Sequence, residues 1–382
     1  MKNTNNVPRL RFPNFTDAWE QRELNKIVKS IDTGKSKFHS DSNNGEYAIL
    51  GSTSIIGYDN CYDYDGDFIL TARVGANAGS LYRYTGKAKI SDNTVFIQAE
   101  KNIEFVYYML TKFDVKQLSF GTGQPLVKAS ELKNLNLKMP TQIEEQQLIG
   151  DYFETLDTLI TLHQRKCDKL EEYKKAMLQK IFSQELRFKR EGGTNYPEWE
   201  QTSLEDVCDI VGGGTPSTKN IDYWNGNIQW FTPSEIGKTK YVSKSVRTIS
   251  QVGFEKSSAR KLPVGTILLT SRATLGEMAI ATIECTTNQG FQSLIPRKIN
   301  GEYLYYLQPT IKNYCNKKAC GSTFNEISKG ELGKCKIPMP HFEEQQKIAD
   351  FLSALDEAIN YAKQELDKWK ELKKGLLQQM FV

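Results

Sequence analysis

The sequence predicts an α/β protein built from two mixed α/β domains that are separated by two long antiparallel coiled-coil helices. Three observations predict this architecture. The chain has 382 residues, more than one ordinary hydrophobic core accommodates. It repeats itself with a period near half its length, and each copy ends in a long stretch with helical periodicity. Two similar halves of this kind are expected to be related by a pseudo-twofold axis.

The repeat is clearest at the start of each helical stretch. Residues 139–147 read Met-Pro-Thr-Gln-Ile-Glu-Glu-Gln-Gln, and residues 339–346 read Met-Pro-His-Phe-Glu-Glu-Gln-Gln. Near the start of each half, the Trp-Glu-Gln of residues 19–21 returns at residues 199–201. The two halves therefore share a common frame.

Inside the halves the similarity is limited to short islands. Leu-Thr-Ala-Arg at residues 70–73 matches Leu-Thr-Ser-Arg at residues 269–272, and Asn93 matches Asn288. The contents of the two domains have diverged within the shared frame. The repeat predicts four segments in chain order: a first domain over 1–138, a first helix over 139–185, a second domain over 186–337 and a second helix over 338–382.

Both helical stretches carry apolar residues at alternating steps of four and three, which is the pattern of a coiled-coil seam. The first seam starts at Ile149 and the second at Ile348. Lys174 and Lys373 occupy matching seam positions, where a polar residue commonly sets register or orientation. Each helix is expected to form a rod about 60 Å long.

Composition excludes several classes of protein. Charged residues make up 25% of the chain and hydrophobic residues 39%, and no apolar run is long enough to cross a bilayer. The polar N-terminus has no secretory leader pattern, so the protein is expected in the cytoplasm. Seven cysteines without a Cys-x-x-Cys suit a reducing compartment, and with three histidines no metal site is expected. A net charge of +4 permits a polyanionic partner without requiring one.

Sequence signatures of catalysis on DNA are missing. The chain has no Gly-x-x-x-x-Gly-Lys-Ser/Thr phosphate loop, and the glycines at 212–214 lack the Gly-x-Gly-x-x-Gly pattern of a dinucleotide or methyl-donor site. It also lacks an Asn-Pro-Pro-aromatic or Asp-Pro-Pro-Tyr stretch. The sequence therefore predicts that the chain is not an enzyme, has no catalytic residues and carries no cofactor.

In combination, these motifs resemble the specificity subunits of type I restriction–modification systems over essentially the whole chain. The resemblance rests on the two helix openings, on the Leu-Arg-Phe segments at 10–12 and 186–188 ahead of Trp-Glu, and on Gly-Thr-Pro-Ser at 214–217. It implies two target-recognition domains that each bind one half of an asymmetric bipartite DNA target. The helices would act as a spacer and as a docking surface for modification subunits.

The same resemblance implies the partners. Two modification subunits would supply methyl transfer, and two restriction subunits, joined through them, would supply the motor and cleavage. Methyl donor, ATP and Mg are accordingly expected on those partner subunits. Eight residues at the helix openings are the candidates for partner docking: Glu144, Glu145, Gln146, Gln147, Glu343, Glu344, Gln345 and Gln346.

Two arginines are the first candidates for DNA contact. Arg73 and Arg272 each follow an apolar, strand-like run and precede a glycine. An arginine so placed can donate two hydrogen bonds to guanine or hold a phosphate. The alternative is a structural ion pair.

Further candidates lie in neighbouring loops. Asparagine can pair with adenine edges, with turn formation as the alternative, and loop hydroxyls and amides suit phosphate contacts. In the first domain, residues 32–36 replace the glycine-rich loop of the second, which places the contact role of the first loop in more doubt. The candidates are Thr71, Thr270, Ser271, Asn93, Asn288, Lys35, Ser36, Thr215, Ser217, Thr122, Gln124, Ser322 and Thr323.

Antiparallel helices would place the two domains at opposite ends of the rod. That length suits DNA sites about one helical turn apart, because equivalent groove faces recur about every 34–36 Å. Two alternatives from other classes remain. One is a protein-interaction scaffold with two partner-binding domains, and the other is an enzyme with a diverged active site.

Overall fold

A computed structural model describes residues 6–37, 45–99, 101–119, 125–319 and 326–382. The chain forms two compact units: unit 1 comprises Met1–Cys167 and Tyr361–Val382, and unit 2 comprises Asp168–Asn360. Within the described residues no helix is long and apolar enough to cross a membrane. The same residues contain no group of three or more His, Cys, Asp or Glu side chains arranged to hold a metal ion.

Unit 1 is built on one six-stranded sheet in the order β2-β7-β5-β6-β3-β4. The longest strands, β5 and β6, pair antiparallel, and Gly66 faces Gly86 in their register. Both glycines have positive φ, +140° and +117°, which side chains rarely adopt. The strands are β2 (Ser30–Thr33), β3 (Tyr47–Leu50), β4 (Ile55–Asp59), β5 (Tyr64–Ala72), β6 (Leu81–Ile90) and β7 (Thr94–Ala99).

A small second sheet explains why the repeated motifs occur together. In unit 1, β1 (Glu20–Glu23) pairs with β8 (Asn136–Met139), so Glu20 lies opposite Met139. In unit 2, β9 (Glu200–Ser203) pairs with β18 (Lys336–Met339), so Glu200 lies opposite Met339. The Trp-Glu motif and the Met-Pro motif of each half are therefore neighbours that join the start of a domain to the start of a helix.

The short helices of unit 1 are α1 (Ile103–Phe113) and α2 (Ala129–Lys133), with 3-10 turns at Leu24–Lys26 and Val115–Leu118. The apolar face of α1 is buried in the main core of unit 1. This core also contains Trp19 from the Trp-Glu motif and Phe153 from the long helix. The repeated motifs are thus core anchors of the unit.

Unit 2 has the same strand pairing, divided between two sheets. One sheet has the order β10-β17-β14-β15-β12 and the other β13-β11-β16. By their pairing, β15 and β16 together take the place of the continuous strand β6. The strands are β10 (Cys208–Gly212), β11 (Trp224–Phe231), β12 (Tyr241–Val242), β13 (Arg247–Ile249), β14 (Ile267–Leu269), β15 (Met278–Ala281), β16 (Cys285–Thr287) and β17 (Gln292–Pro296).

The short helices among the described residues of unit 2 are α4 (Leu204–Val207), α5 (Gln251–Glu255), α6 (Gly301–Tyr306), α7 (Gln308–Lys318) and α8 (Lys329–Gly333). The 3-10 turns lie at Ile221–Tyr223 and Pro233–Glu235. Helices α6 and α7 pack into the main core of this unit through residues such as Tyr303 and Ile311. They hold the place that α1 holds in unit 1.

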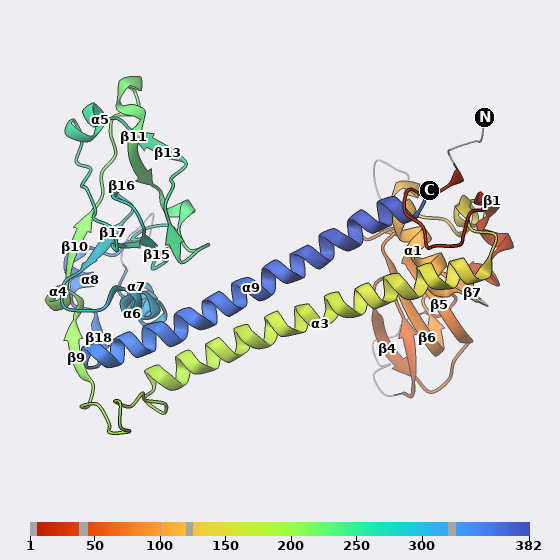
Figure 1. The fold of residues 1–382 in the computed structure, drawn as a ribbon, viewed down its shortest axis with the longest axis horizontal. Helices are drawn as coiled ribbons and strands as arrows, with labels where there is room; N and C mark the ends of the chain where they lie inside the picture. The colour runs from red at the N-terminus through yellow and green to blue at the C-terminus, as the bar shows by residue number, and fades with distance from the viewer. Residues whose placement is uncertain (1–5, 38–44, 100, 120–124, 320–325) are drawn as a thin grey trace. The chain divides into compact units, whose positions relative to one another are not determined.

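Two long helices, α3 (Ile143–Phe182) and α9 (Phe342–Met380), each begin in one unit and end in the other (Figure 1). Within unit 1 they run antiparallel, because Phe153 packs on Phe381 whereas His163, further along α3, packs on Trp369. Within unit 2 they also run antiparallel: the end of α3, at Ile181, shares a core with the start of α9, at Ile348. The expected antiparallel pairing is therefore present in both units.

The helices are slightly shorter than the segments 139–185 and 338–382. Residues Met139 and Met339 belong to strands, and each helix starts after the proline that follows. Helix α3 ends where Gln184 adopts a left-handed φ of +62° and Leu186 N–H donates to Lys180 C=O at 3.0 Å. A left-handed residue is a common way to end a helix.

Candidate nucleic-acid interface

In each unit, the ends of several strands meet at one tight turn. In unit 1 this is the turn at 91–94: Ser91 N–H donates to Leu50 C=O at 2.9 Å, and Thr94 C=O accepts from Gly34 N–H at 2.9 Å. In unit 2 the corresponding turn lies at 287–290. There Asn288 N–H donates to Phe231 C=O at 3.1 Å, and Thr287 C=O accepts from Gly214 N–H at 2.8 Å. We call these the unit 1 and unit 2 loop clusters.

The backbone hydrogen bonds show that Arg73 and Arg272 do not occupy equivalent positions in the two units. The equivalent positions differ by one residue from the alignment of the sequence motifs. In unit 1, Arg73 N–H donates to Asn93 C=O at 3.0 Å, and Arg73 C=O accepts from Val127 N–H at 2.8 Å. In unit 2 the same two bonds are made by Ser271, which donates to Gly290 C=O at 2.8 Å and accepts from Ile327 N–H at 3.2 Å. The position equivalent to Arg73 is therefore Ser271, and the alignment of Arg73 with Arg272 does not hold in the structure.

The two asparagines are also not equivalent. Asn288 occupies the position of Ser91, and its side-chain Oδ1 accepts from Gly290 N–H at 2.8 Å. Ser91 makes the matching turn, because its Oγ accepts from Asn93 N–H at 3.3 Å. Asn288 thus makes the turn considered as the alternative to base contact, whereas Asn93 is exposed.

The two arginine side chains have different surroundings. Arg272 Nε lies 2.9 Å from Glu326 Oε1, and the two side chains are 42% and 34% exposed. That is the ion pair considered as the alternative to DNA contact. Arg73 is half-buried, and its guanidinium has no ion-pair partner within the described part of the chain.

A glycine anchors the equivalent loop in both units. A Cβ atom on Gly34 would lie 2.3 Å from the carbonyl oxygens of Ile90 and Ser91, and one on Gly213 would lie 2.0 Å from the carbonyl oxygen of Asn288. The first loop therefore keeps the glycine that its turn requires, although its sequence departs from the second. Beside Gly34, the Lys35 side chain is exposed.

The hydroxyls of these loops are partly engaged. Ser36 Oγ donates to Asp63 Oδ2 at 2.9 Å, Thr215 Oγ1 donates to Gln289 Oε1, and Ser217 is exposed. Three other candidates, Thr71, Thr270 and Ser271, have fully buried side chains. Thr122, Gln124, Ser322 and Thr323 lie outside the described residues. The structure thus brings Lys35, Arg73 and Asn93 together at the unit 1 loop cluster as accessible polar side chains.

Beside the unit 2 loop cluster lies an open cavity of about 850 Å³, to which sequence reasoning assigned no residue. Its walls come from β10, from α5 and the segment that follows it, and from α8. The segment after α5 passes so close to the glycine loop that a Cβ atom on Gly214 would lie 2.4 Å from Ser258. The lining residues are Ile210, Val211, Gly212, Phe254, Glu255, Ser257, Ser258, Ala259, Arg260, Lys261 and Lys329.

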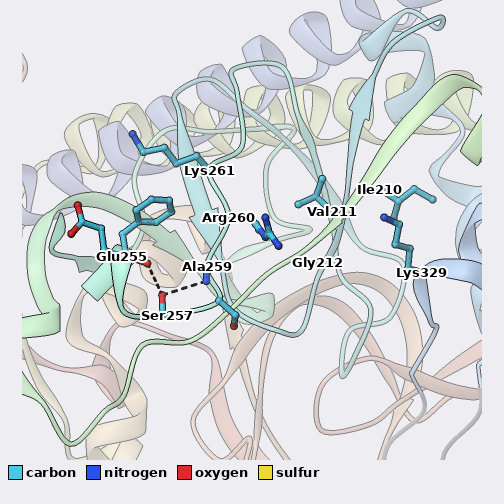
Figure 2. Close-up of a pocket in the computed structure, with 11 residues that line it drawn as sticks. Ile210, Val211, Gly212, Glu255, Ser257, Ala259, Arg260, Lys261 and Lys329 are labelled. Carbon is cyan, nitrogen blue, oxygen red and sulfur yellow. Dashed lines mark hydrogen bonds between the residues drawn. The ribbon is translucent and has the colours of Figure 1, made fainter. Parts of the chain in front are cut away.

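Two cations in this cavity are accessible. Figure 2 shows Arg260 and Lys329 entering from different segments, whereas Lys261 extends away from them. Lys261 forms an ion pair with Glu284 at 3.0 Å. Arg260 and Lys329 are exposed, and neither has an ion-pair partner among the residues that the structure describes. The sequence signal that points to the cavity is the polar and basic run at residues 255–261, which does not recur in the first half.

The candidate docking residues divide into two sets. Glu145 and Glu344 are fully buried. Glu145 receives two hydrogen bonds from Arg11, at 2.6 and 2.8 Å. Glu344 receives bonds from Arg187 at 3.0 Å and from Trp199 Nε1 at 3.0 Å. Their carboxylates therefore join the start of each domain to the start of its helix.

Two glutamines serve the helix starts in the same way. Gln146 Nε2 donates to Pro140 C=O at 2.9 Å, and Gln345 Nε2 donates to Pro340 C=O at 2.9 Å. The remaining candidates are exposed on the first turns of the two helices: Glu144, Gln147, Glu343 and Gln346. These four side chains are exposed, whereas Gln146 is half-buried and Gln345 is buried.

This duplicated fold, with paired loop clusters on a shared helix pair, defines a protein with two related recognition domains. The chain belongs to the family of the type I restriction modification DNA specificity domain, whose model matches residues 16–172 and 196–370. It is 39% identical over 207 residues to the type I restriction enzyme MjaIX specificity subunit of Methanocaldococcus jannaschii, covering 53% of this chain and 48% of that relative.

Two further similarities extend over most of the chain. It is 24% identical to the type I restriction enzyme EcoR124I/EcoR124II specificity subunit of Escherichia coli, over 89% of this chain and 86% of that protein. A crystal structure of the S subunit of a type I restriction–modification system from M. genitalium has the same fold, with a TM-score of 0.67 and 17% identity. The match covers 98% of this chain and 99% of that one.

Proposed function

We propose that the protein is the DNA sequence-specificity subunit of a type I restriction–modification complex and that each domain binds one half of an asymmetric bipartite target. One observation carries the proposal: the two loop clusters share a hydrogen-bonded frame but present different side chains. Equivalent frames place the two surfaces alike, and different side chains select different bases.

In unit 2, Arg260 and Lys329 are the proposed contacts to DNA phosphates. Both are accessible cations at one cavity beside the loop cluster. In unit 1 the proposed contacts are Arg73, Lys35 and Asn93, because these polar side chains are accessible at the 91–94 turn. An arginine and an asparagine can both discriminate bases, whereas a lysine at this position suits a phosphate.

The chain itself is proposed to be non-catalytic. Modification subunits would bring the methyl donor and the transfer chemistry, and restriction subunits joined through them would bring ATP, Mg and cleavage. The exposed residues on the first turns of α3 and α9 are the proposed docking surface for two modification subunits. The helix pair, which both units share, would set the separation of the two half-sites.

The test is a binding measurement over a range of salt concentrations, with this chain and its modification subunits on a duplex that contains the target. Replacing both Arg260 and Lys329 by Gln removes two phosphate contacts. Each phosphate contact releases a counterion when the protein binds. The plot of the logarithm of the DNA association constant against the logarithm of the salt concentration should therefore become less steep, with a slope smaller in magnitude by about 2. The control K298Q removes an exposed unit 2 lysine that does not line the cavity.

Methylation of targets altered in one half-site gives the second readout. Because phosphate contacts carry no sequence information, the double variant should methylate every target more slowly, while its discrimination at both half-sites stays as in the unaltered protein. A salt slope equal to that of K298Q would show that the cavity does not contact DNA. If DNA binding depended neither on the sequences of the two half-sites nor on the salt concentration, the result would instead favour a protein-interaction scaffold.

A further inference from the structure

A cluster of charged and tyrosine side chains joins the globular part of unit 1 to the two long helices. Asp157 of α3 accepts from Tyr108 of α1 at 2.6 Å and from Lys373 of α9 at 2.5 Å. Tyr108 is fully buried. One carboxylate therefore connects three helices, two from the long pair and one from the domain.

Unit 2 contains the same cluster with the helices exchanged. Asp356 of α9 accepts from Tyr306 of α6 at 2.6 Å and forms an ion pair with Lys174 of α3. Tyr306 is 3% exposed. The lysines are the two matching seam residues, so each has its carboxylate partner on the opposite helix.

A second cation completes each cluster, and it comes from different elements in the two units. In unit 1, Arg83 of β6 lies 4.9 Å from the ring centre of Tyr107 and pairs with Glu154 of α3 at 3.2 Å. In unit 2, Lys240 lies ahead of β12. It is 4.6 Å from the ring centre of Tyr306 and bonds to Ser353 of α9 at 2.8 Å.

The two cations also have equivalent acidic partners. Arg83 lies 3.7 Å from Glu104 at the start of α1, and Lys240 forms an ion pair with Glu302 at the start of α6. Unrelated segments of two diverged domains thus place a cation on equivalent tyrosines, and that cation contacts α3 in unit 1 and α9 in unit 2. Chance packing does not explain why two different segments place a cation at equivalent positions. A functional requirement common to both units does explain it.

These contacts are partly shielded from water, and the Arg83 and Asp157 side chains are 26% and 32% exposed. Lys240 is 11% exposed and Lys373 is 18% exposed. Burial, followed by the hydrogen bond to its aspartate, raises the pKa of Tyr108 and of Tyr306 far above the usual value, so both phenols remain protonated donors. Directional bonds between buried groups restrict rotation more strongly than apolar contact does.

We propose that these two clusters are positioning joints: each fixes the orientation of its recognition domain on the helix pair and so limits the protein to one spacing between half-sites. The unit 1 joint comprises Arg83, Tyr108, Asp157 and Lys373, and the unit 2 joint comprises Lys174, Lys240, Tyr306 and Asp356. The proposal rests on the proposed function. Adjacent base pairs are 3.4 Å apart along the duplex, so a small rotation of a domain reaches a neighbouring spacing.

The experiment measures methylation by the complex of this chain with its modification subunits. The substrates are duplexes with both native half-sites and with spacers of the native length, one base pair shorter and one base pair longer. The variants are K240M/Y306F for the unit 2 joint and R83M/Y108F for the unit 1 joint. The matched control is K334M/Y314F, because Lys334 and Tyr314 bond to Glu331 within the domain and form no hydrogen bond or ion pair with the described residues of either long helix.

For each protein, the rate of methylation of duplexes with a shorter or longer spacer is divided by the rate for the native spacer. In both joint variants this ratio should be at least about tenfold higher than in the unaltered protein, as expected for loss of a hydrogen bond to a charged group. The control should keep the unaltered preference. Loss of activity with an unchanged spacing preference would overturn the proposal, because it would show only a structural role. If a double variant unfolds, Y306F alone, which keeps the ring, is judged by the same criterion.

The unaltered complex separates this proposal from the one on which it rests. If it methylates DNA without regard to half-site sequence, the proposed function fails. If it requires both half-sites and one spacing, and the joint variants keep that spacing, only the positioning role fails.

Discussion

At the residue scale, the adjacent glutamates of each helix opening have different roles. Glu344 is fully buried and accepts from Arg187 and Trp199, whereas Glu343 beside it is exposed. The hydrogen bond from Arg187 to Glu344 raises the pKa of that guanidinium, so Arg187 remains positively charged beside the buried carboxylate. Removing the buried carboxylate would leave the Trp199 indole N–H without its partner and Arg187 with only its ion pair to Glu198 and its bonds to backbone carbonyls.

This difference predicts unequal effects of two neighbouring substitutions. E344A should lower the free energy of unfolding of unit 2 by about 3 kcal/mol, because it breaks the ion pair of a buried carboxylate and leaves an indole N–H unbonded. E343A should change it by less than about 1 kcal/mol. Urea unfolding of the full chain, followed by tryptophan fluorescence, measures both. Equal midpoints for the two variants would contradict the structural role assigned to Glu344.

Sequence periodicity and repetition could identify these residues but could not separate them. The Glu-Glu-Gln-Gln run recurs as a block, so all eight residues were candidates for partner docking. The distinction depends on Arg11 and Arg187, which lie far away in the sequence and reach the helix only after β1 pairs with β8 and β9 pairs with β18.

At the element scale, the loop clusters depend on glycines at close approaches of the backbone. G213A should destabilise unit 2 by about 3 kcal/mol, because its Cβ would lie 2.0 Å from a backbone oxygen that cannot move independently. G375A is the matched control. A Cβ at Gly375 in α9 meets nothing within 4 Å, and alanine favours a helix by about 1 kcal/mol.

Thermal unfolding of the two variants provides the measurement. The melting temperature of G213A should fall and that of G375A should stay the same or rise. A G213A protein as stable as the unaltered chain would show that the loop does not approach the 287–290 turn as closely as described.

The long helices were predictable at this scale, and the strand register was not. Apolar steps of four and three persist over ten turns or so, which determines a helix and its buried face. The similar segments at 70–73 and 269–272 are four residues long. Their identical residues align Arg73 with Arg272, whereas the backbone hydrogen bonds make Arg73 equivalent to Ser271. Arg73 and Arg272 therefore occupy different positions in the segments that follow β5 and β14, and they have different surroundings.

At the scale of the whole molecule, duplication explains both the shared frame and the divergent contents. The paired strands, helix openings and joints are present in both units. The loop clusters and the cavity differ, and the cavity has no counterpart in the sequence repeat. The sequence repeat therefore predicted the frame. It could not predict the cavity, because Gly212, Arg260 and Lys329 lie in three separated segments that only the folded structure brings together.

The central claim is that two unlike surfaces on one repeated frame recognise two unlike half-sites. Sequencing the methylated positions in the DNA of a host that carries the complete system tests it most directly. The account predicts two different short sequences separated by a spacer of constant length, with R73A, which removes a proposed base contact of unit 1, relaxing only one of them. A single uninterrupted motif, or two half-sites that relax equally in that variant, would contradict it.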